Sequence, residues 1–155
     1  MVLAVVIIAS AIAVWRWLGR LEACLVLATG LSPLIYSVLK LIVNRPRPSP
    51  DLVRVLVVEE GSGFPSGHAF FATVFFGLLA YFAYSHLQKR SLRVLALSGF
   101  LLLILLVGAS RVYLGAHWPS DVLGGFLLGA VFLAALIWLH RKWRPNFSNT
   151  SSLCC

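Results

Sequence analysis

Long runs without a charged side chain limit what this chain can fold into more than any other feature. Five runs contain no Asp, Glu, Lys or Arg, and four of them are long enough for a membrane-spanning helix. Such a helix needs ~20 mainly apolar residues, with a range of roughly 17 to 25. We therefore expect a polytopic bundle of transmembrane helices. The runs cover residues 1–15, 23–39, 61–88, 94–110 and 122–139.

The first run is the shortest and allows two interpretations. It begins at Met1 and ends before Arg16. We count it as a span, because Arg16 and Trp17 can extend their side chains into the membrane interface. A cleaved signal peptide is the alternative, but the run has neither a basic start nor an evident small-residue cleavage site.

The composition argues against an ordinary soluble domain. Of the 155 residues, 60% are hydrophobic and 12% are charged, whereas globular domains carry about 25% charged residues. A soluble domain of this size could not cover so much apolar surface. The lipid bilayer is therefore the expected surroundings of the helices.

The basic residues gather at alternate ends of the predicted spans. Eight of the thirteen Lys and Arg residues lie between spans one and two, between spans three and four, and after span five. The positive-inside rule places these ends in the cytoplasm, so the net charge of +8 needs no nucleic-acid partner. We expect one transmembrane domain over residues 1–145 and a disordered cytoplasmic tail over residues 146–155. The five basic residues on the other side are Lys40, Arg45, Arg47, Arg54 and Arg111.

Prolines and glycines give expectations about the connections. Pro33 should kink span two, with Ser32 and Ser37 available to satisfy the freed backbone groups. Residues 44–63 read as an extracytoplasmic loop, with a short surface helix as one option. Pro145 should stop span five. Close packing of span five is expected at Gly124, Gly125 and Gly129.

The three cysteines do not suggest a disulfide framework. Cys24 lies in an apolar run and behaves as a small hydrophobic residue. Cys154 and Cys155 end the chain on the predicted cytoplasmic side, where thiols stay reduced. The terminal pair fits either a palmitoylation site or an ordinary frayed tail.

Three polar stretches reach the predicted extracytoplasmic side, each at the end of a span. Together they supply three cations, two histidines, one carboxylate and a helix N-terminus. Charged groups at membrane depth are costly and tend to be functional. The stretches are Lys40 with Arg47-Pro48, then Ser66-Gly67-His68, then Arg111 with His117 and Asp121.

This set of groups suits a phosphate monoester or a pyrophosphate. The three cations can neutralise an anionic phosphoryl group, and arginine can bind it through two nitrogens. The amides of Gly67 and His68 open a helix, and helix N-termini favour anions. Phosphoryl transfer depends mainly on positioning and charge stabilisation, so we expect no metal and no cofactor.

Two histidines and a carboxylate can perform the chemistry. His117 can attack phosphorus when its other ring nitrogen is held as N–H, and Asp121 could hold it. His68 could then protonate the leaving oxygen. Taken singly, each group also has a structural interpretation: a lysine can snorkel, and an aspartate suits a first helical turn. Their joint placement on one side favours a site.

These motifs resemble the signature of the type 2 phosphatidic acid phosphatase superfamily over about residues 20–140. The signature K-x6-R-P, P-S-G-H and S-R-x5-H-x3-D is present without a mismatch from Lys40 to Pro48, Pro65 to His68 and Ser110 to Asp121. The family includes lipid phosphate phosphatases, bacterial undecaprenyl pyrophosphate phosphatases and glucose-6-phosphatases. The resemblance implies a membrane phosphatase for a lipid phosphate or pyrophosphate, such as undecaprenyl pyrophosphate, phosphatidic acid or phosphatidylglycerol phosphate.

The resemblance also implies a role for each residue. His117 would be the nucleophile that forms a phosphohistidine, Asp121 its orienting partner and His68 the general acid. The family core usually has six spans, and five here correspond to losing the first. Loss of the first span places the N-terminus on the extracytoplasmic side. It is also consistent with a Met1 that lies within a longer reading frame. The implied phosphate-binding set is Lys40, Arg47, Ser66, Gly67 and Arg111.

Two functions of other classes stay open on the sequence. Soluble vanadium haloperoxidases share the anion site, with vanadate where phosphate would sit, although the apolar spans argue against a soluble enzyme. A non-catalytic membrane scaffold is the other alternative. Neither the lipid nor the oligomeric state can be read from the sequence.

Overall fold

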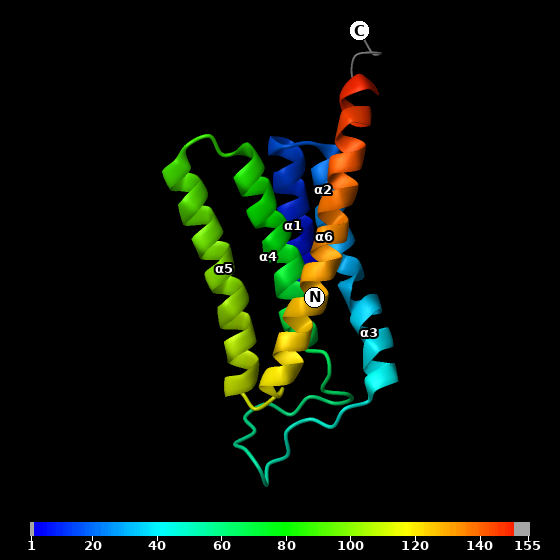
Figure 1. The fold of residues 1–155 in the computed structure, drawn as a ribbon, viewed down its shortest axis with the longest axis vertical. Coiled ribbons are helices and arrows are strands. Elements are labelled where there is room, and N and C mark those ends of the chain that lie inside the picture. The colour runs from blue at the N-terminus through cyan, green and yellow to red at the C-terminus, as the bar shows by residue number, and fades with distance from the viewer. Residues whose placement is uncertain (1, 151–155) are drawn as a thin grey trace.

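The structure, a computed structural model, describes residues 2–150, and it describes the surroundings of the side chains over residues 3–144 (Figure 1). Residues 2–150 contain helices and connecting segments but no strand. The predicted all-α architecture is therefore confirmed. The elements are α1 (Val2–Trp17), α2 (Arg20–Ala28), the 3-10 turn η1 (Thr29–Leu31), α3 (Ser32–Val43), α4 (Gly67–His86), α5 (Arg90–Tyr113) and α6 (Pro119–Thr150).

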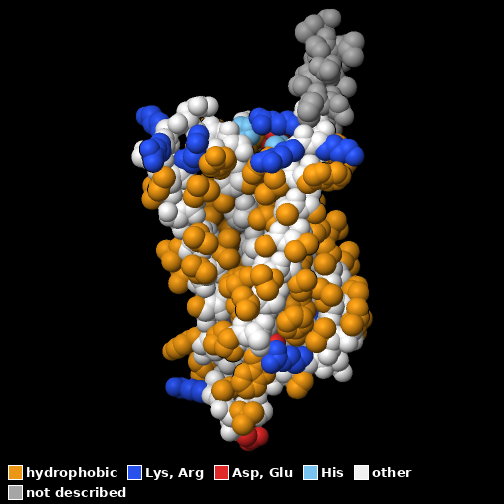
Figure 2. All heavy atoms as spheres, viewed as in Figure 1, with side chains coloured by type: hydrophobic (Ala, Val, Ile, Leu, Met, Phe, Trp, Pro, Cys, Tyr) orange, Lys and Arg blue, Asp and Glu red, His pale blue; other side chains and the backbone are white. Residues whose placement is uncertain are grey.

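Four segments are long and apolar enough to cross a membrane: Arg20–Val43, Gly67–His86, Arg90–Tyr113 and Pro119–Arg144. The predicted first span is the shorter apolar helix α1. Hydrophobic side chains cover the outside of the bundle between its two ends (Figure 2), most openly along α5. Such a surface suits lipid rather than water, and the protein is a multi-pass membrane protein.

The basic turns and the polar motifs lie at opposite ends of the bundle. The turns between α1 and α2 and between α4 and α5 share one end with the basic part of α6, where Lys and Arg gather in Figure 2. The loop of residues 44–66 and the turn of residues 114–118 lie at the other end. The predicted separation of the two groups is confirmed, and the side that each end faces stays a prediction.

Helix α4 forms the centre of the bundle, and its first turns lie directly against α6. Phe70, Val74 and Leu78 of α4 are buried in the core. A Cβ atom at Gly125 would lie 2.6 Å from the carbonyl oxygen of Ser66, and one at Gly129 would lie 2.9 Å from that of Phe70. Both positions therefore need glycine, as the sequence predicts, because larger residues would push α4 and α6 apart.

A buried polar chain ties α2, α4 and α6 together at the basic end. His140 is fully buried, and its Nε2 lies 3.2 Å from Oε1 of Glu22. Its Nδ1 lies 2.9 Å from the hydroxyl of Tyr81. Buried polar groups need such partners, so these contacts hold the three helices in one register far from the motifs.

The second predicted span is interrupted near Pro33. Helix α2 ends at Ala28, η1 follows, and α3 begins at Ser32. Pro33 therefore lies in the first turn of α3. Backbone N–H groups in a first turn have no partner within the helix, so the missing N–H of proline costs no helical hydrogen bond. The hydroxyl of Ser32 donates to the carbonyl of Thr29 at 2.5 Å. The expected kink is present as a short 3-10 break.

One connection matches the expected loop, without the optional surface helix, and another differs from the expectation. Residues 44–66 contain no helix; the loop is held by the amides of Leu56 and Val57, which donate to the carbonyl of Leu114. Helix α6 does not stop at Pro145 but continues to Thr150, because a proline removes a single helical hydrogen bond and bends a helix without always ending it. The tail is thus helical over residues 146–150, while residues 151–155, with Cys154 and Cys155, lie outside the described residues.

Candidate active site

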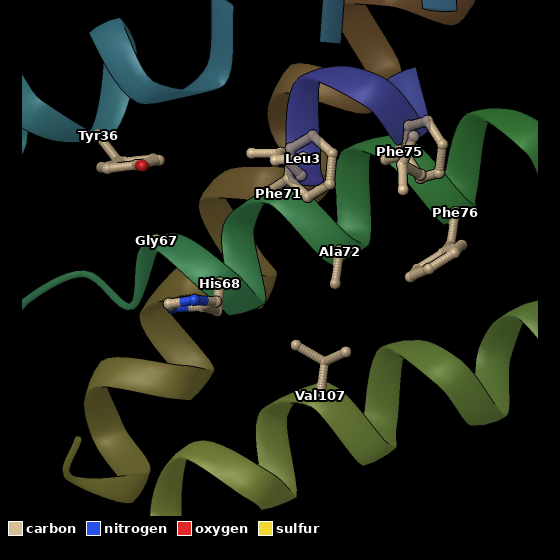
Figure 3. A pocket seen from close by; sticks show the side chains of 10 residues that line it. Leu3, Tyr36, Gly67, His68, Phe71, Ala72, Phe75, Phe76 and Val107 are labelled. Carbon is tan, nitrogen blue, oxygen red and sulfur yellow. The ribbon is translucent and has the colours of Figure 1, made fainter. Parts of the chain in front are cut away.

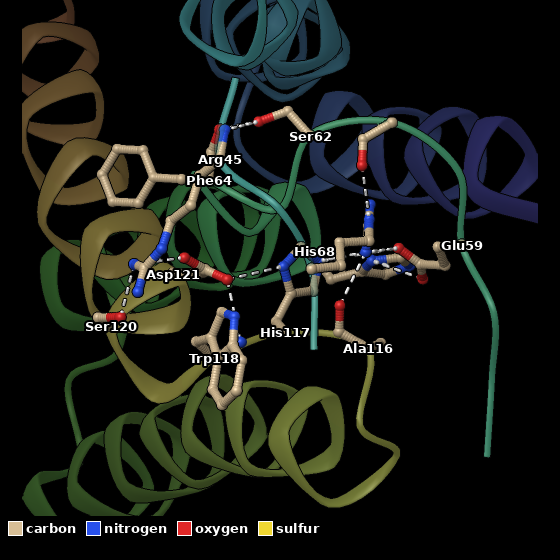
Figure 4. A network of polar contacts seen from close by, with 12 residues as sticks. Arg45, Glu59, Ser62, Phe64, His68, Ala116, His117, Trp118, Ser120 and Asp121 are labelled. Atoms are coloured by element: carbon tan, nitrogen blue, oxygen red, sulfur yellow. Dashed lines mark hydrogen bonds and ion pairs between the residues drawn. The ribbon is translucent and has the colours of Figure 1, made fainter. Parts of the chain in front are cut away.

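The three polar stretches come together at the end of the bundle opposite the basic turns (Figure 4). The main chain joins two of them, because the amide of Ser66 donates to the carbonyl of Asp121 at 2.9 Å. That bond places the start of α4 beside the start of α6. The predicted residues lie in the last turn of α3 (Lys40), the loop (Arg47), the start of α4 (Ser66, Gly67, His68), the last turn of α5 (Arg111), the turn before α6 (His117) and the first turn of α6 (Asp121).

His117 is almost completely enclosed, with a side chain 1% exposed. Its Nε2 lies 3.4 Å from Nη1 of Arg47, and its Nδ1 lies 3.7 Å from Oδ2 of Asp121. Burial lowers the pKa of His117 and Arg47 lowers it further, while Glu59, Asp121 and the Gly63 backbone raise it only in part. A neutral imidazole with Nε2 facing the cations is the form that a nucleophile needs.

Asp121 is fully buried and held by two hydrogen bonds. Its Oδ1 accepts from Nη1 of Arg45, and its Oδ2 accepts from the amide of Trp118, both at 2.9 Å. The 3.7 Å to Nδ1 of His117 is within ion-pair range but beyond hydrogen-bond distance. Nδ1 has no hydrogen-bond partner among the described residues, so the predicted pair lies together without a direct bond.

Arg45 has a role that the sequence motifs did not indicate. Its guanidinium donates to Oδ1 of Asp121 at 2.9 Å and to the hydroxyl of Ser120 at 2.8 Å. Arg45 therefore fixes the carboxylate that faces His117. Its place among the six variable positions of the K-x6-R-P motif, in a chain with few charges, was the available signal.

The arginines predicted to bind phosphate line one side of His117. Arg47 donates through Nη1 to the carbonyl of Ala116 at 2.8 Å and through Nε to that of Gly61 at 3.0 Å. Arg111 lies in the last turn of α5 with a side chain 19% exposed. Lys40 lies with its ammonium 5.7 Å from the ring centroid of Tyr36. The cations thus reach the site from α3, the loop and α5.

The start of α4 supplies polar groups at the same place. Ser66 is the N-cap residue, but its side chain makes no capping bond. Its buried hydroxyl has no partner within the part of the chain that the structure describes, so it can serve a ligand. A Cβ at Gly67 would lie 2.8 Å from the ring of Tyr36. The side chain of His68 is 55% exposed.

Glu59, which belongs to no motif, lies at the centre of the predicted anion site. Its carboxylate is 2.9 Å from Nη1 of Arg47 and 3.7 Å from Nη1 of Arg111. It also lies 3.7 Å from Nε2 of His117 and 4.0 Å from Nδ1 of His68. Burial alone would raise the pKa of Glu59, but Arg47, His68 and His117 lower it below its usual value. An ionised carboxylate is thus surrounded by the groups predicted to hold phosphate.

An apolar cavity of about 420 Å³ opens beside His68 (Figure 3). Gly67 and His68 belong both to its wall and to the polar site, so the cavity and the site are continuous. The other lining residues are apolar or aromatic and come from four helices. They are Leu3 and Val6 of α1, Tyr36 of α3, Phe71, Ala72, Phe75 and Phe76 of α4, and Val107 of α5.

Comparison with known proteins identifies the family. The family model described as the PAP2 superfamily matches residues 21–145, a range that contains all three motifs. The chain belongs to the PAP2 superfamily. The resemblance predicted from the motifs is therefore confirmed, while the PAP2 roles of the individual residues stay predictions.

Curated PAP2 relatives match most of this chain. It is 39% identical over 130 residues to phosphatidylglycerophosphatase B of Bacillus subtilis, covering 81% of this chain and 60% of that protein. It is 29% identical over 138 residues to lipid phosphate phosphatase delta of Arabidopsis thaliana, covering 83% of this chain and 33% of that protein. The chain thus spans about 60% and 33% of the lengths of these two relatives.

A solved structure has the same PAP2 fold. It is the crystal structure of the first transmembrane PAP2 type phosphatidylglycerolphosphate phosphatase from Bacillus subtilis. The TM-score is 0.72 at 35% sequence identity, over 90% of this chain and 68% of that one. Similarity at this level supports the helical arrangement that brings the three PAP2 motifs together.

Proposed function

We propose that this protein is an integral-membrane phosphatase that hydrolyses a lipid phosphate or pyrophosphate. The observation that carries the proposal is the continuity of two surfaces: His68 belongs to the polar site around His117 and also to the wall of the apolar cavity. The phosphoryl group would bind on the polar side, and the lipid chain would lie in the cavity. The relatives' names, phosphatidylglycerophosphatase and lipid phosphate phosphatase, support this substrate class.

The proposed reaction has two steps. Nε2 of His117 attacks phosphorus, the bond from phosphorus to the lipid oxygen breaks, and His68 protonates that oxygen. Water, deprotonated by His68, then attacks the phosphohistidine and releases inorganic phosphate. Arg47 and Arg111 would stabilise the charge that develops on the phosphoryl oxygens, with Lys40 as a further cation.

The histidine–aspartate pair supports this assignment. Asp121 faces Nδ1, so it would hold the N–H tautomer that leaves Nε2 free to attack. Catalytic hydrogen bonds are often long without substrate and shorten in the complex, which is consistent with the 3.7 Å separation. The fixed cations would supply the charge stabilisation that a metal supplies elsewhere, so we propose a metal-independent reaction. We also propose that the site faces the extracytoplasmic side.

Phosphate release from a panel of lipids tests the function. Purified protein should release inorganic phosphate from phosphatidic acid, phosphatidylglycerol phosphate or undecaprenyl pyrophosphate, with EDTA present. His117→Asn should abolish release, and a labelled phosphate donor should label wild-type His117. His86→Asn, at the opposite end of the bundle, is the matched control and should stay active. Unchanged release by His117→Asn would exclude the mechanism, and halide oxidation with vanadate but no phosphate release would support the haloperoxidase alternative.

A further inference from the structure

The position of Glu59 conflicts with the binding of a phosphoryl group. For attack by His117, phosphorus must lie within about 3–3.5 Å of the attacking nitrogen. In this structure Oε2 of Glu59 lies 3.7 Å from that nitrogen, on the side that faces Arg47. A phosphoryl group placed for reaction would overlap the carboxylate. The two anions cannot share the site.

The carboxylate makes the contacts that a phosphate would make. Arg47 pairs with it at 2.9 Å, and Arg111 lies at 3.7 Å. His68 lies at 4.0 Å from it (Figure 4). Without an anion the guanidinium groups of Arg47 and Arg111 would repel one another. A carboxylate supplied by the chain itself offsets that repulsion while the site is empty of substrate.

We propose that Glu59 is a built-in competitor of the substrate: its carboxylate fills the anion site, and it leaves when a phosphoryl group binds. The proposal rests on the proposed function, because it assigns the same site to the phosphoryl group. An incoming anion has to displace a tethered carboxylate, which weakens the apparent binding of every anion by the same factor. Dianionic phosphate monoesters, which the cations attract more strongly, can still occupy the site, whereas the weaker, singly charged phosphodiesters of ordinary membrane lipids are kept out.

The loop gives the side chain room to leave. Glu59 is 25% exposed, and a second cavity of about 190 Å³ adjoins it, lined in part by Val55, Val57 and Val58. The backbone on both sides is anchored, by Val57 to Leu114 and by Gly61 to Arg47. Rotation of the side chain alone can therefore empty the site while the loop stays in place.

Phosphate binding by charge variants tests the proposal. Inorganic phosphate is titrated calorimetrically into the purified full-length protein, as wild type, Glu59→Gln and Glu60→Gln. If the occupied form of the site predominates, removing the competing charge should tighten phosphate binding about tenfold in Glu59→Gln. Glu60→Gln removes a charge from the same loop, but the Glu60 side chain is exposed and only its carbonyl contacts Arg47. It should bind phosphate like the wild type.

The direction of the change in phosphate affinity decides whether Glu59 competes with the phosphoryl group. If Glu59 instead organises the cations, Glu59→Gln will bind phosphate more weakly, and equal or weaker binding overturns the proposal. Glu59→Ala should shift binding in the same direction as Glu59→Gln, and thermal unfolding shows that each variant is folded. A soluble phosphodiester such as dimethyl phosphate should gain affinity by about the same factor as phosphate, because both anions displace the same carboxylate. If the wild type hydrolyses no lipid phosphate, the proposed phosphatase function is wrong. The role of Glu59 is still tested separately, because it depends only on the phosphate affinities of the wild type and the variants.

Discussion

At the scale of single residues, the protonation of His117 should govern how the rate depends on pH. Burial and Arg47 lower its pKa, against the smaller opposing effects of Glu59 and Asp121. A lowered pKa keeps the imidazole neutral at more acidic pH. The acid limb of kcat/KM should therefore lie below about 6.5, the ordinary pKa of histidine. Because Glu59 raises this pKa, Glu59→Gln should move the limb to still lower pH, and a limb above 6.5 would contradict the assignment.

Arg45 gives a second prediction at this scale. Its guanidinium holds the buried carboxylate of Asp121, and hydrogen bonds to charged groups contribute roughly 1.5–3 kcal/mol. Arg45→Gln should lower kcat about tenfold and leave KM nearly unchanged, since the residue acts on the His117–Asp121 pair and not on substrate. The control is Arg54→Gln, an exposed arginine of the same loop. Equal losses in both variants would show a general charge effect instead.

The sequence predicted the residues of the motifs but missed Glu59 and Arg45. The motif residues have fixed spacings, and the alternation of spans brings them to one end. Glu59 has no spacing rule, because it reaches the site through a loop whose path depends on tertiary contacts with Leu114. The scarcity of acidic residues, five in the whole chain, was the one available hint.

At the scale of elements, the cavity between α4 and α5 should select for a lipid chain. Val107 lines it from α5, and its neighbour Leu106 is 54% exposed on the outside of the same helix. Val107→Trp should fill the cavity and lower kcat/KM for a long-chain lipid phosphate about tenfold, a loss of ~1.4 kcal/mol. Activity on a short-chain, water-soluble phosphate ester should change little.

Leu106→Trp is the matched control, because it adds the same bulk on the outer face. It should leave both substrates unaffected. A Val107→Trp variant that slows the two substrates equally would mean that the substitution disturbs the polar site and that the chain binds elsewhere.

The helices were predictable where the signal was a long uncharged run, and less so where local contacts decide. Four runs became helices that can span a membrane. The break at Thr29–Leu31 depends on how a few backbone carbonyls find partners, among them the one bonded by Ser32. Helix α6 likewise continues beyond Pro145. The outcome depends on whether the stability of the long preceding helix outweighs the one hydrogen bond that proline removes.

At the scale of the whole molecule, the separation of basic turns from motifs predicts an orientation. The end with the basic turns should face the cytoplasm. In a variant whose cysteines are replaced by serine, Asp51→Cys in the loop should react with a membrane-impermeant maleimide in intact cells. Gln88→Cys, in the turn between α4 and α5, should react only after permeabilisation; both positions are exposed. The reverse pattern would place the candidate active site in the cytoplasm.

The bond between the amide of Ser66 and the carbonyl of Asp121 has a practical consequence. Both atoms belong to the main chain, so the alignment of the two helix starts does not depend on which side chains they carry. A variant that lacks the attacking imidazole should therefore keep its architecture and still hold the lipid it cannot cleave. Purified from its native membrane, such an inactive variant would act as bait, and mass spectrometry of the co-purified lipid would reveal the natural substrate.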